Sequence, residues 1–581
     1  MRLFAGKLSS APWALLPSRQ SSILKDVPVL VAGWALLYGL MSLASYWAGP
    51  VNTQPEINLN PAALPRYALF SIARLAIAYA ASLLVTLVYG YVAAHNFRAE
   101  RVLIPLLDTL QSIPVLSFLP PVMVAMVALF PSSQLGVELG AILLIATGQV
   151  WNMTFSLYSS IKNVPREMLE AAQVYQMSWF QQFVQIELPF AAIGLVWNSM
   201  MSVAGGWFFL MACEMFVLGR RDLRLPGLGS YLQTAANAGN TRAIVWGVSA
   251  MITVIVMTDQ IIWRPLIAWS EKFKFEQVEA SHVRHSPVLQ LLRHSRVLGY
   301  IARVAAQPAL ESLYLRFSRK KLWSSSETPQ PRWNKAAYRF ICGVLLLGLC
   351  YAAAKGGIML SKISAAELSK IMIGAGATFL RVELVLLLAA LWTVPVGVAI
   401  GLRPSLATVA QPLAQIAASV PATALFPIVL LVLIRSGGGL GVGSIVLLLL
   451  GTQWYLLFNV IAGASAIPTD LKEVCGVFRM GRLERWRKLI LPAIFPYLIT
   501  GFVTASGGAW NASIVAEYFH FHGETFTTTG LGSVISGATD TGNFPLLLAA
   551  TLAMACMVVT VNRLVWRRLY GLASGRFSMN G

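Results

Sequence analysis

The sequence predicts an all-α membrane protein built from two tandem, parallel copies of one unit of about six transmembrane helices. Two observations support this prediction. The 581 residues are 57% hydrophobic and only 12% charged, which is about half the charged fraction of a soluble domain. The second half of the chain also repeats the first. A helix needs roughly 20 apolar residues to cross a bilayer, and about twelve such stretches can be placed.

The expected spans form two sets of six. They lie near 27–48, 66–94, 103–130, 135–160, 190–217 and 243–268 in the first copy, and near 338–360, 371–402, 409–435, 439–462, 493–519 and 545–566 in the second. An even number of spans returns the chain to its starting side, so the copies run parallel, unlike the inverted repeats of many secondary transporters. The first stretch has no evident cleavage site after it and is expected to remain as a span.

The internal repeat is visible residue by residue. A shift of 303 aligns Trp151, Pro165, Glu170, Leu188-Pro189, Trp207, Glu214 and Gly227 with Trp454, Pro468, Glu473, Leu491-Pro492, Trp510, Glu517 and Gly530. Further upstream the shift becomes 307, where Pro105, Pro114 and Pro120 align with Pro412, Pro421 and Pro427. These matches are too many and too regular for chance.

The net charge of +20 is concentrated beside the expected spans. Between 271 and 339 there are thirteen basic and five acidic residues. Such flanks mark the cytoplasmic side of a membrane, so we expect a positive-inside pattern and no nucleic-acid partner. The predicted organisation is a cytoplasmic N-terminus (1–26), a first unit (27–268), a basic cytoplasmic linker (269–336), a second unit (337–566) and a cytoplasmic tail (567–581).

Two regions leave alternatives open. The linker stretch 286–304 mixes apolar and basic residues, which fits either a helix lying on the membrane surface or a solvated linker. The basic loop 219–224 falls on the external side in this topology. Either it contacts an acidic partner there or a span has been missed, and we expect the first because the repeat predicts the same topology twice.

Catalysis and metal binding are not expected in this chain. The five cysteines form no CxxC pair and mostly lie in apolar runs, as buried thiols do. His520 and His522 have no equivalent in the first copy, so a surface pair is favoured over a metal site. No nucleophile or His/Cys/Asp cluster occurs in either copy. The sequence therefore predicts no catalytic residue, no metal and no bound cofactor.

Two polar stretches of equal length, 170–190 and 473–493, interrupt the apolar pattern at matching positions. With the prolines that precede them, they are called the first polar segment (165–190) and the second polar segment (468–493). Each is expected to form two short helices with a break. Pro165 and Pro468 suit a first helical turn. Ser178 and Gln181 form a possible capping box. An amphipathic loop lying on the membrane is the structural alternative.

These segments resemble the EAA loop of the inner-membrane subunits of ABC importers. That family pattern has Glu-Ala-Ala, a Gly six residues after the Glu, and a Leu-Pro that ends nineteen residues after it. Both copies match this frame. Glu170, Ala171 and Ala172 match literally, whereas Glu473, Val474 and Cys475 keep the Glu and a small third residue. Gln176 and Arg479 replace the Gly, and Gly481 could supply the turn in the second copy.

The stretches 204–216 and 507–519, with the Gly-Leu-Gly-Ser that follows each, resemble the fifth span of the nitrate, taurine and sulfonate branch of these importers. The resemblance implies a bacterial inner-membrane permease in which two units are fused. It further implies that the two polar segments couple to two cytoplasmic ATPase subunits that hold ATP and Mg, and that an external binding protein delivers a small anion. The chain has no GxxxxGK[ST] motif, so ATP hydrolysis is expected on separate subunits.

Candidate path residues lie in the apolar spans, where Trp207 and Glu214 match Trp510 and Glu517 and where Asn511 adds polarity nearby. They are Trp207, Glu214, Trp510, Asn511 and Glu517, with Pro114 and Pro421 in proline-rich breaks of the third spans. Charged groups within a bilayer usually face a cavity or a partner. Each Glu could therefore line a pathway or hold neighbouring helices together, and each break could form a gate or a simple kink. A secondary transporter or channel driven by an ion gradient is the alternative function, and a membrane enzyme is the third.

Overall fold

The computed structural model describes residues 56–273 and 335–576, apart from short gaps at 132, 219–220, 436–438, 468 and 522–523, together with a few isolated residues outside these ranges. The expected first span, 27–48, and the linker stretch 286–304 lie almost entirely outside the described residues. Helices account for nearly all of the described chain, together with two short two-stranded hairpins. The all-α prediction is confirmed.

The elements of the first unit follow the order expected from the sequence. They are α3 (Leu64–His95), α4 (Phe97–Ser112), η4 (Val115–Phe118), α5 (Leu119–Leu129), α6 (Leu135–Lys162), α7 (Arg166–Val174), α8 (Trp179–Gln182), η5 (Phe183–Glu187), α9 (Leu188–Glu214), β1 (Val217–Leu218), β2 (Arg221–Asp222), α10 (Leu228–Asn237), α11 (Thr241–Thr258), η6 (Asp259–Trp263) and α12 (Arg264–Ser270).

The second unit repeats this order. Its elements are α16 (Lys335–Leu360), α17 (Ala365–Gly401), α18 (Pro404–Ser419), α19 (Ala422–Arg435), α20 (Leu440–Ser465), α21 (Thr469–Val477), α22 (Arg482–Arg485), η9 (Trp486–Ile490), α23 (Leu491–Ala516), β3 (Tyr518–Phe521), β4 (Glu524–Thr527), α24 (Leu531–Thr541), α25 (Phe544–Val561), η10 (Asn562–Trp566) and α26 (Arg567–Arg576). The π-helical turns η5 and η9 match at a shift of 303, as do η6 and η10.

Eight helices of the described chain are long and apolar enough to cross a membrane. They correspond to the second, fourth, fifth and sixth expected spans of each copy. The third expected span of the first copy is a broken pair, 97–111 and 115–129, bent by 85°. In the second copy the break between α18 and α19 falls at Val420-Pro421. The expected breaks are confirmed, because Pro cannot donate the helical hydrogen bond and disfavours a helical residue before it.

Each unit is built on three long helices with the fourth expected span in the middle. In the first unit α6 packs between α3 and α9, and in the second α20 packs between α17 and α23. Gly90 of α3 faces Leu157 of α6, and the matching Gly397 of α17 faces Val460 of α20. Small residues at such crossings let membrane helices approach closely.

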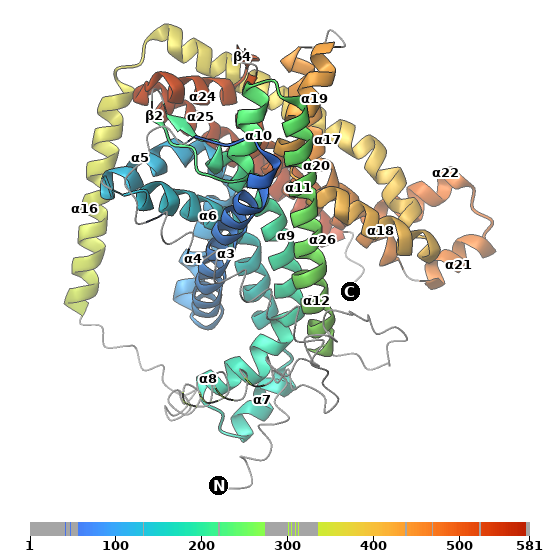
Figure 1. Cartoon of the computed structure of the whole chain (residues 1–581). Coiled ribbons are helices and arrows are strands. Elements are labelled where there is room, and N and C mark those ends of the chain that lie inside the picture. Colours follow the sequence, from blue (N-terminus) through green and yellow to red (C-terminus); the bar gives the residue numbers. More distant parts are fainter. Residues whose placement is uncertain are drawn as a thin grey trace.

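The two units contact each other at the end of the molecule that carries the hairpins. There α19 packs against α9, α10 and α11, while η4 contacts α23 and α25. One apolar core runs through both units across this seam. In Figure 1 the helices α7 and α8 lie at the bottom and α21 and α22 at the right, both away from β2 and β4 at the top. The two units are therefore in contact near the hairpins, and their polar segments lie apart from each other.

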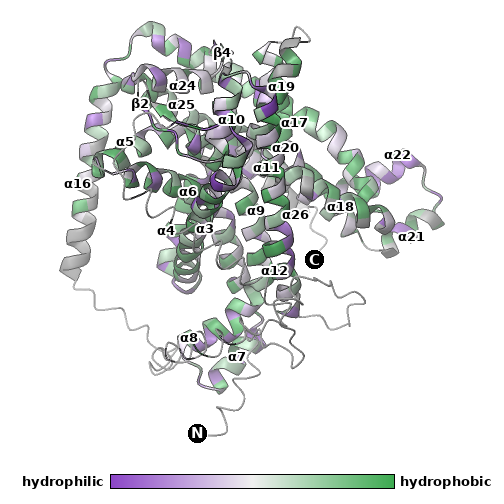
Figure 2. Cartoon of the chain, in the orientation of Figure 1, coloured by the Kyte–Doolittle hydropathy of each residue, from purple (hydrophilic) through white to green (hydrophobic). Residues whose placement is uncertain are grey.

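Hydropathy follows this arrangement. The long helices of both units are mainly hydrophobic, whereas polar residues gather on α7, α8, α21 and α22 (Figure 2). The two hairpins, β1–β2 and β3–β4, are antiparallel and follow α9 and α23 at equivalent places. The polar segments and the hairpins thus mark opposite ends of the duplicated fold.

Candidate functional site

The first polar segment folds as two short helices and a tight turn. α7 starts directly after Pro165, which is its N-cap residue and so lies one position before the first helical turn that was expected. α8 starts at the expected capping box: the Ser178 backbone N–H donates to Gln181 Oε1 at 2.7 Å, and the Gln181 N–H donates to Ser178 Oγ at 3.3 Å. The turn η5 then joins α8 directly to α9. The segment is therefore continuous with a helix of membrane-crossing length.

The second polar segment has the same backbone with different capping. α21, α22 and η9 have nine, four and five residues, as do α7, α8 and η5. Gly481 is the N-cap residue of α22 and has no side chain with which to cap it. Glu484, which matches Gln181, forms an ion pair with Lys488 instead, and the distance between Lys488 Nζ and Glu484 Oε1 is 2.6 Å. The duplicated geometry therefore does not depend on the capping box.

The turn within each segment is left-handed. Gln176 has φ 49° and Arg479 has φ 47°, and among the described residues no other non-glycine residue has a positive φ. The Met177 N–H donates to the Ala172 carbonyl at 3.0 Å, and the Met480 N–H donates to the Cys475 carbonyl at 3.1 Å. These bonds close the C-terminal ends of α7 and α21.

The expectation that Gly481 supplies this turn is wrong, because Gly481 has φ −64° and extended backbone. The turn falls at the position where the family pattern has Gly. A side chain there costs roughly 1–2 kcal/mol of backbone strain.

Each segment has a buried inner face and an exposed end. Ala172 is 1% exposed and Cys475 is 4% exposed, so the matched small residues face their own unit. The other predicted coupling residues, Glu170, Ala171, Gln176, Glu473, Val474 and Arg479, are exposed. The exposed end carries two large apolar side chains in each copy, here called the apolar tips: Val174 (80% exposed) and Tyr175 (75%), and Val477 (80%) and Phe478 (71%).

In the first unit a charged contact ties the polar segment to α3. The His95 Nε2 lies 3.0 Å from Glu187 Oε1, and the Gln182 side-chain amide donates to the same oxygen at 2.8 Å. The ring of Tyr91 stacks on His95 with 4.1 Å between centroids, and it lies 5.8 Å from Trp179. The start of α9 is thus fixed to the end of α3.

In the second unit an apolar contact takes this place. At shifts of 307 and 303, His95 and Glu187 correspond to Leu402 and Ile490. Ile490 is buried, and Leu402 packs against its cluster. This contact between the end of the second expected span and the start of the fifth is here called the joint of each unit. The joint is therefore polar in the first unit and apolar in the second.

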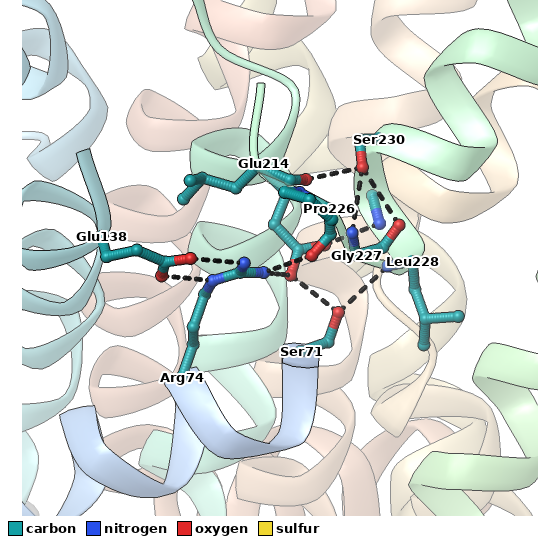
Figure 3. A network of polar contacts seen from close by, with 10 residues as sticks. Ser71, Arg74, Glu138, Glu214, Pro226, Gly227, Leu228 and Ser230 are labelled. Atoms are coloured by element: carbon teal, nitrogen blue, oxygen red, sulfur yellow. Dashed lines mark hydrogen bonds and ion pairs between the residues drawn. The ribbon is translucent and has the colours of Figure 1, made fainter. Parts of the chain in front are cut away.

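A buried charge network holds the opposite end of the first unit together (Figure 3). Arg74 on α3 donates from Nε and Nη2 to the Glu138 carboxylate on α6, at 2.6 and 2.7 Å. Its Nη1 donates to Glu214 Oε1 and to the Pro226 carbonyl, both at 2.8 Å. All three charged side chains are fully buried. The Gly229 N–H donates to Glu214 Oε2 at 2.7 Å. The network thus joins α3, α6, α9 and the start of α10.

The second unit has a smaller version of this network. Arg381 forms an ion pair with Glu517, and the Thr378 hydroxyl donates to the same carboxylate at 2.8 Å. The Gly532 N–H donates to Glu517 Oε2 at 2.7 Å, as its counterpart does in the first unit. The matching stretch of α20, 440–444, has no acidic residue, so Glu138 has no counterpart. The Arg381 side chain is 11% exposed. One arginine therefore faces two carboxylates in the first unit and one in the second.

Glu214 and Glu517 are bonded within their own units, which fits the packing role among the two interpretations. Neither carboxylate lines the cavities between the units. Arg74 and Arg381 were not among the residues predicted from the sequence. A single basic residue at matched positions inside the apolar spans 66–94 and 371–402 was the available signal, because a charge in a span requires a partner.

A cavity of about 160 Å³ lies on the seam between the units. Trp207 from the first unit and Asn511 and Pro421 from the second line it. Asp259 is the only charged side chain among the lining residues, and Arg264 Nε lies 3.2 Å from its carboxylate. Trp510 is fully buried and lies outside the lining, as does Pro114, which precedes η4 at the break of the third span. Three predicted path residues therefore meet at one cavity.

A second cavity of about 350 Å³ lies beside the hairpins and is also lined by both units. Asp222 and Arg224 enter it from the first unit and pair with each other at 2.5 Å. Tyr518 and Asp540 enter it from the second, and the Tyr518 hydroxyl donates to Asp540 at 2.6 Å. Burial and the Asp540 carboxylate raise the pKa of the Tyr518 phenol. In the basic loop 219–224, Arg224 therefore finds its acidic partner within the loop.

Comparison with known proteins finds relatives among transport permeases. The nitrate import permease protein NrtB of Leptolyngbya laminosa is 28% identical over 189 residues, which are 32% of this chain and 64% of that protein. The bicarbonate transport system permease protein CmpB of Synechococcus elongatus is 31% identical over 24% of this chain and 49% of its own length. The taurine transport system permease protein TauC of Escherichia coli is 25% identical over 33% and 68%. The chain thus spans about half to two thirds of the length of the relatives it matches.

One protein family matches the chain twice. The binding-protein-dependent transport system inner membrane component matches residues 86–261 and 393–571. The two matches cover more than half of the chain, and each contains one polar segment and the glutamate, Glu214 or Glu517, of one charge network. The protein belongs to the family of binding-protein-dependent transport system inner membrane components and carries two of its units in tandem.

Proposed function

We propose that this chain is the membrane-spanning subunit of an ATP-driven importer, in which two polar segments couple it to two separate ATPase subunits. The two exposed apolar tips carry the proposal. Large apolar side chains exposed at 71–80% on a polar surface mark sites of interaction with a partner. Both tips occupy the same place in a fold that belongs to a transport family.

The backbone supports a lever action for each segment. α8 continues through η5 into α9, and α22 continues through η9 into α23. α9 lines the cavity on the seam, and α23 contributes Asn511 to it. A partner that moves a tip would therefore turn a helix that lines the cavity, as in rigid-body switching between inward-open and outward-open states.

The partners follow from the family and from the sequence. The chain has no GxxxxGK[ST] motif for ATP, so ATP and Mg would bind to the ATPase subunits. A binding protein on the opposite face would deliver the solute. The basic flanks support a topology in which the polar segments and both ends of this chain would lie in the cytoplasm of a bacterium, with the spans in the inner membrane.

The proposed solute is a small anion or sulfonate, since the relatives are named as nitrate, bicarbonate and taurine transporters. A cavity of about 160 Å³ is close to the size that holds a benzene-sized molecule. Its lining includes no basic side chain that would hold an anion tightly. The cavity suits passage, and selection would then rest with the binding protein.

Reconstitution tests this proposal. The chain is purified with its co-purifying ATPase, and solute uptake into proteoliposomes is measured with and without ATP. Tyr175→Asp with Phe478→Asp should release the ATPase and abolish uptake, because a carboxylate would enter an apolar contact. Glu167→Gln, exposed on α7 outside the tip, is the matched control and should leave both unchanged. Uptake driven by an ion gradient without ATP would favour a secondary transporter and refute the proposal.

A further inference from the structure

We infer that the two polar segments dock two different ATPase subunits, and that the subunit on the second segment has an acidic rim around its docking groove. This inference rests on the proposed function. Three features of the segments support it: their backbones, their apolar tips and the charged residues beside the tips.

The backbones are equivalent. The three elements of each segment have equal lengths, and the left-handed turn falls at Gln176 and at Arg479 with φ values that differ by 2°. A groove that fits one segment by shape therefore fits the other. Shape alone would allow a pair of identical subunits.

The apolar tips are also equivalent, whereas beside them Leu483 on α22 is 71% exposed and its counterpart Phe180 on α8 is half-buried. Ala172 and Cys475 take the same buried position, and the tips differ only by the exchange of Tyr175 for Phe478. Apolar residues at the centre of an interface supply most of its affinity. The two segments therefore share the apolar part of one docking mode.

The charges around this shared centre are opposite. The first segment has one basic and three acidic residues, of which Glu187 is buried against His95, so its exposed net charge is −1, whereas the second has six basic and three acidic residues, a net charge of +3. Arg479, Arg482 and Arg485 are exposed beside the second tip. Their counterparts in the first segment are Gln176, Trp179 and Gln182.

The counterparts in the first segment are partly turned toward their own unit. Trp179 is half-buried and lies against Tyr91, and the Gln182 amide is bonded to the buried Glu187. On α22 all four residues are exposed. The first segment thus offers a partner little charge near its tip, whereas the second offers three guanidinium groups.

One groove cannot complement both surfaces. Charge complementarity at the rim of an interface sets specificity and association rate, and like charges placed together disfavour the wrong partner. An acidic rim would suit Arg479, Arg482 and Arg485 but would meet the net negative first segment. Two grooves with different rims satisfy both segments, and the fused chain fixes which unit meets which groove.

Anionic lipid is the competing occupant of the basic residues, since such clusters beside a membrane also bind lipid headgroups. Arg479 argues against lipid because it directly follows Phe478 at the tip. In Figure 1, α21 and α22 also project away from the helix bundle. Arg487 and Lys488, which precede α23, are the residues better placed for headgroups.

The subunit composition of the native complex is the first test. The tagged full chain is extracted gently from its own membranes, and the intact complex is weighed by native mass spectrometry. One chain with two ATPase subunits of different mass is the expected result. One chain with two copies of a single ATPase would overturn this inference and leave the proposed function standing. A chain without any ATPase would overturn the proposed function itself.

Two matched charge variants test whether the arginines beside the second tip select the ATPase subunit. Arg479→Glu with Arg485→Glu should lower the occupancy of one ATPase at least tenfold and spare the other. Gln176→Glu with Gln182→Glu places the same charges on the first segment and should spare the subunit that the arginine variant releases. Elution by size exclusion checks that both proteins stay folded. Equal loss of both ATPases in the two variants, or unchanged occupancy with less bound anionic lipid in the arginine variant, would overturn the inference.

Discussion

Replacement of Arg74 by Met should destabilise the protein more than any other single change at the charge networks. The side chain is fully buried, and it binds two carboxylates and one carbonyl oxygen. Met keeps most of the apolar stem and removes all of these bonds. Glu138 and Glu214 would then lie near each other without a counter-charge, in a site that water does not reach.

The expected magnitude follows from the number of bonds lost. Removal of one partner of a buried ion pair costs about 3–5 kcal/mol, because the remaining charge stays buried. Two carboxylates lose their partner here, so we expect the upper end, about 5 kcal/mol. In a unit of this size each kcal/mol lowers the melting temperature by about 2–4 °C. The loss should therefore be roughly 10–20 °C.

Two further variants separate the contributions. Glu138→Gln leaves Arg74 facing the single carboxylate of Glu214, a neutral pair, and keeps an oxygen as acceptor. Its cost should be about 1.5–3 kcal/mol, the value of one hydrogen bond to a charged group, because the Gln amide can accept from only one of the two Arg74 N–H groups that Glu138 binds. Arg381→Met leaves only Glu517 without a counter-charge, and Glu517 keeps its hydrogen bonds from Thr378 and Gly532. Its cost should be about 3 kcal/mol, the lower end of the range.

Thermal melting of the purified chain in lipid nanodiscs, followed by tryptophan fluorescence, gives this ranking. Arg74→Met should melt lowest, Arg381→Met next, and Glu138→Gln highest of the three. The reasoning is refuted if Arg74→Met melts within about 2 °C of the unchanged protein, less than the loss of one hydrogen bond would produce. It is refuted equally if Glu138→Gln is as harmful as Arg74→Met, because the second carboxylate would then need no neutralisation.

Three other changes have clear expected outcomes. Gln176→Gly should stabilise the turn of the first polar segment by about 1 kcal/mol and slow its proteolysis, whereas Gln173→Gly inside α7 should cost about that much. Gly227→Ala should lower the melting temperature and the yield of folded protein, because the added methyl group would overlap the Glu214 carboxylate. His95→Leu and Glu187→Ile should each destabilise the protein, whereas the double variant, which copies Leu402 and Ile490, should recover most of the loss in melts.

Each of these expectations has a contrary result. Faster proteolysis of the Gln176→Gly protein would mean that the left-handed turn carries no strain. Gly507→Ala is the control for the glycine variant, since an added methyl group there meets no atom within 4 Å. Equal losses at Gly227 and Gly507 would deny the close packing around Glu214. Additive losses in the double variant would mean that His95 and Glu187 do not act as a pair.

Features encoded by neighbouring residues were predictable from the sequence. The apolar runs predicted the long helices, and the matches at shifts of 303 and 307 predicted the duplication. The capping box at Ser178 is a local pattern and formed as expected. The position of the left-handed turn could be predicted only from the place of the Gly in the family pattern, because Gln176 and Arg479 have no turn preference of their own.

The buried network was not predictable in this way. Arg74 meets residues 64 and 140 positions further along the chain, and these contacts depend on how three helices are rotated against each other. Glu138 also breaks the repeat, so the second copy gave no hint of it. The seam cavity likewise needs both units in place. Matched positions identified Trp207 and Trp510 as equivalent, but the packing around the seam exposes only Trp207 to the cavity.

Tandem fusion changes what a single mutation does to the whole assembly. In a permease made of two identical chains, every substitution appears twice, so a harmful change at one joint also harms the other. Here His95 and Glu187 occur at one joint, and Leu402 and Ile490 occur at the other. A substitution therefore alters one half while the other half retains its joint. Selection can then act on the two halves separately. A harmful substitution impairs one half of the assembly without the same change being present in the other half.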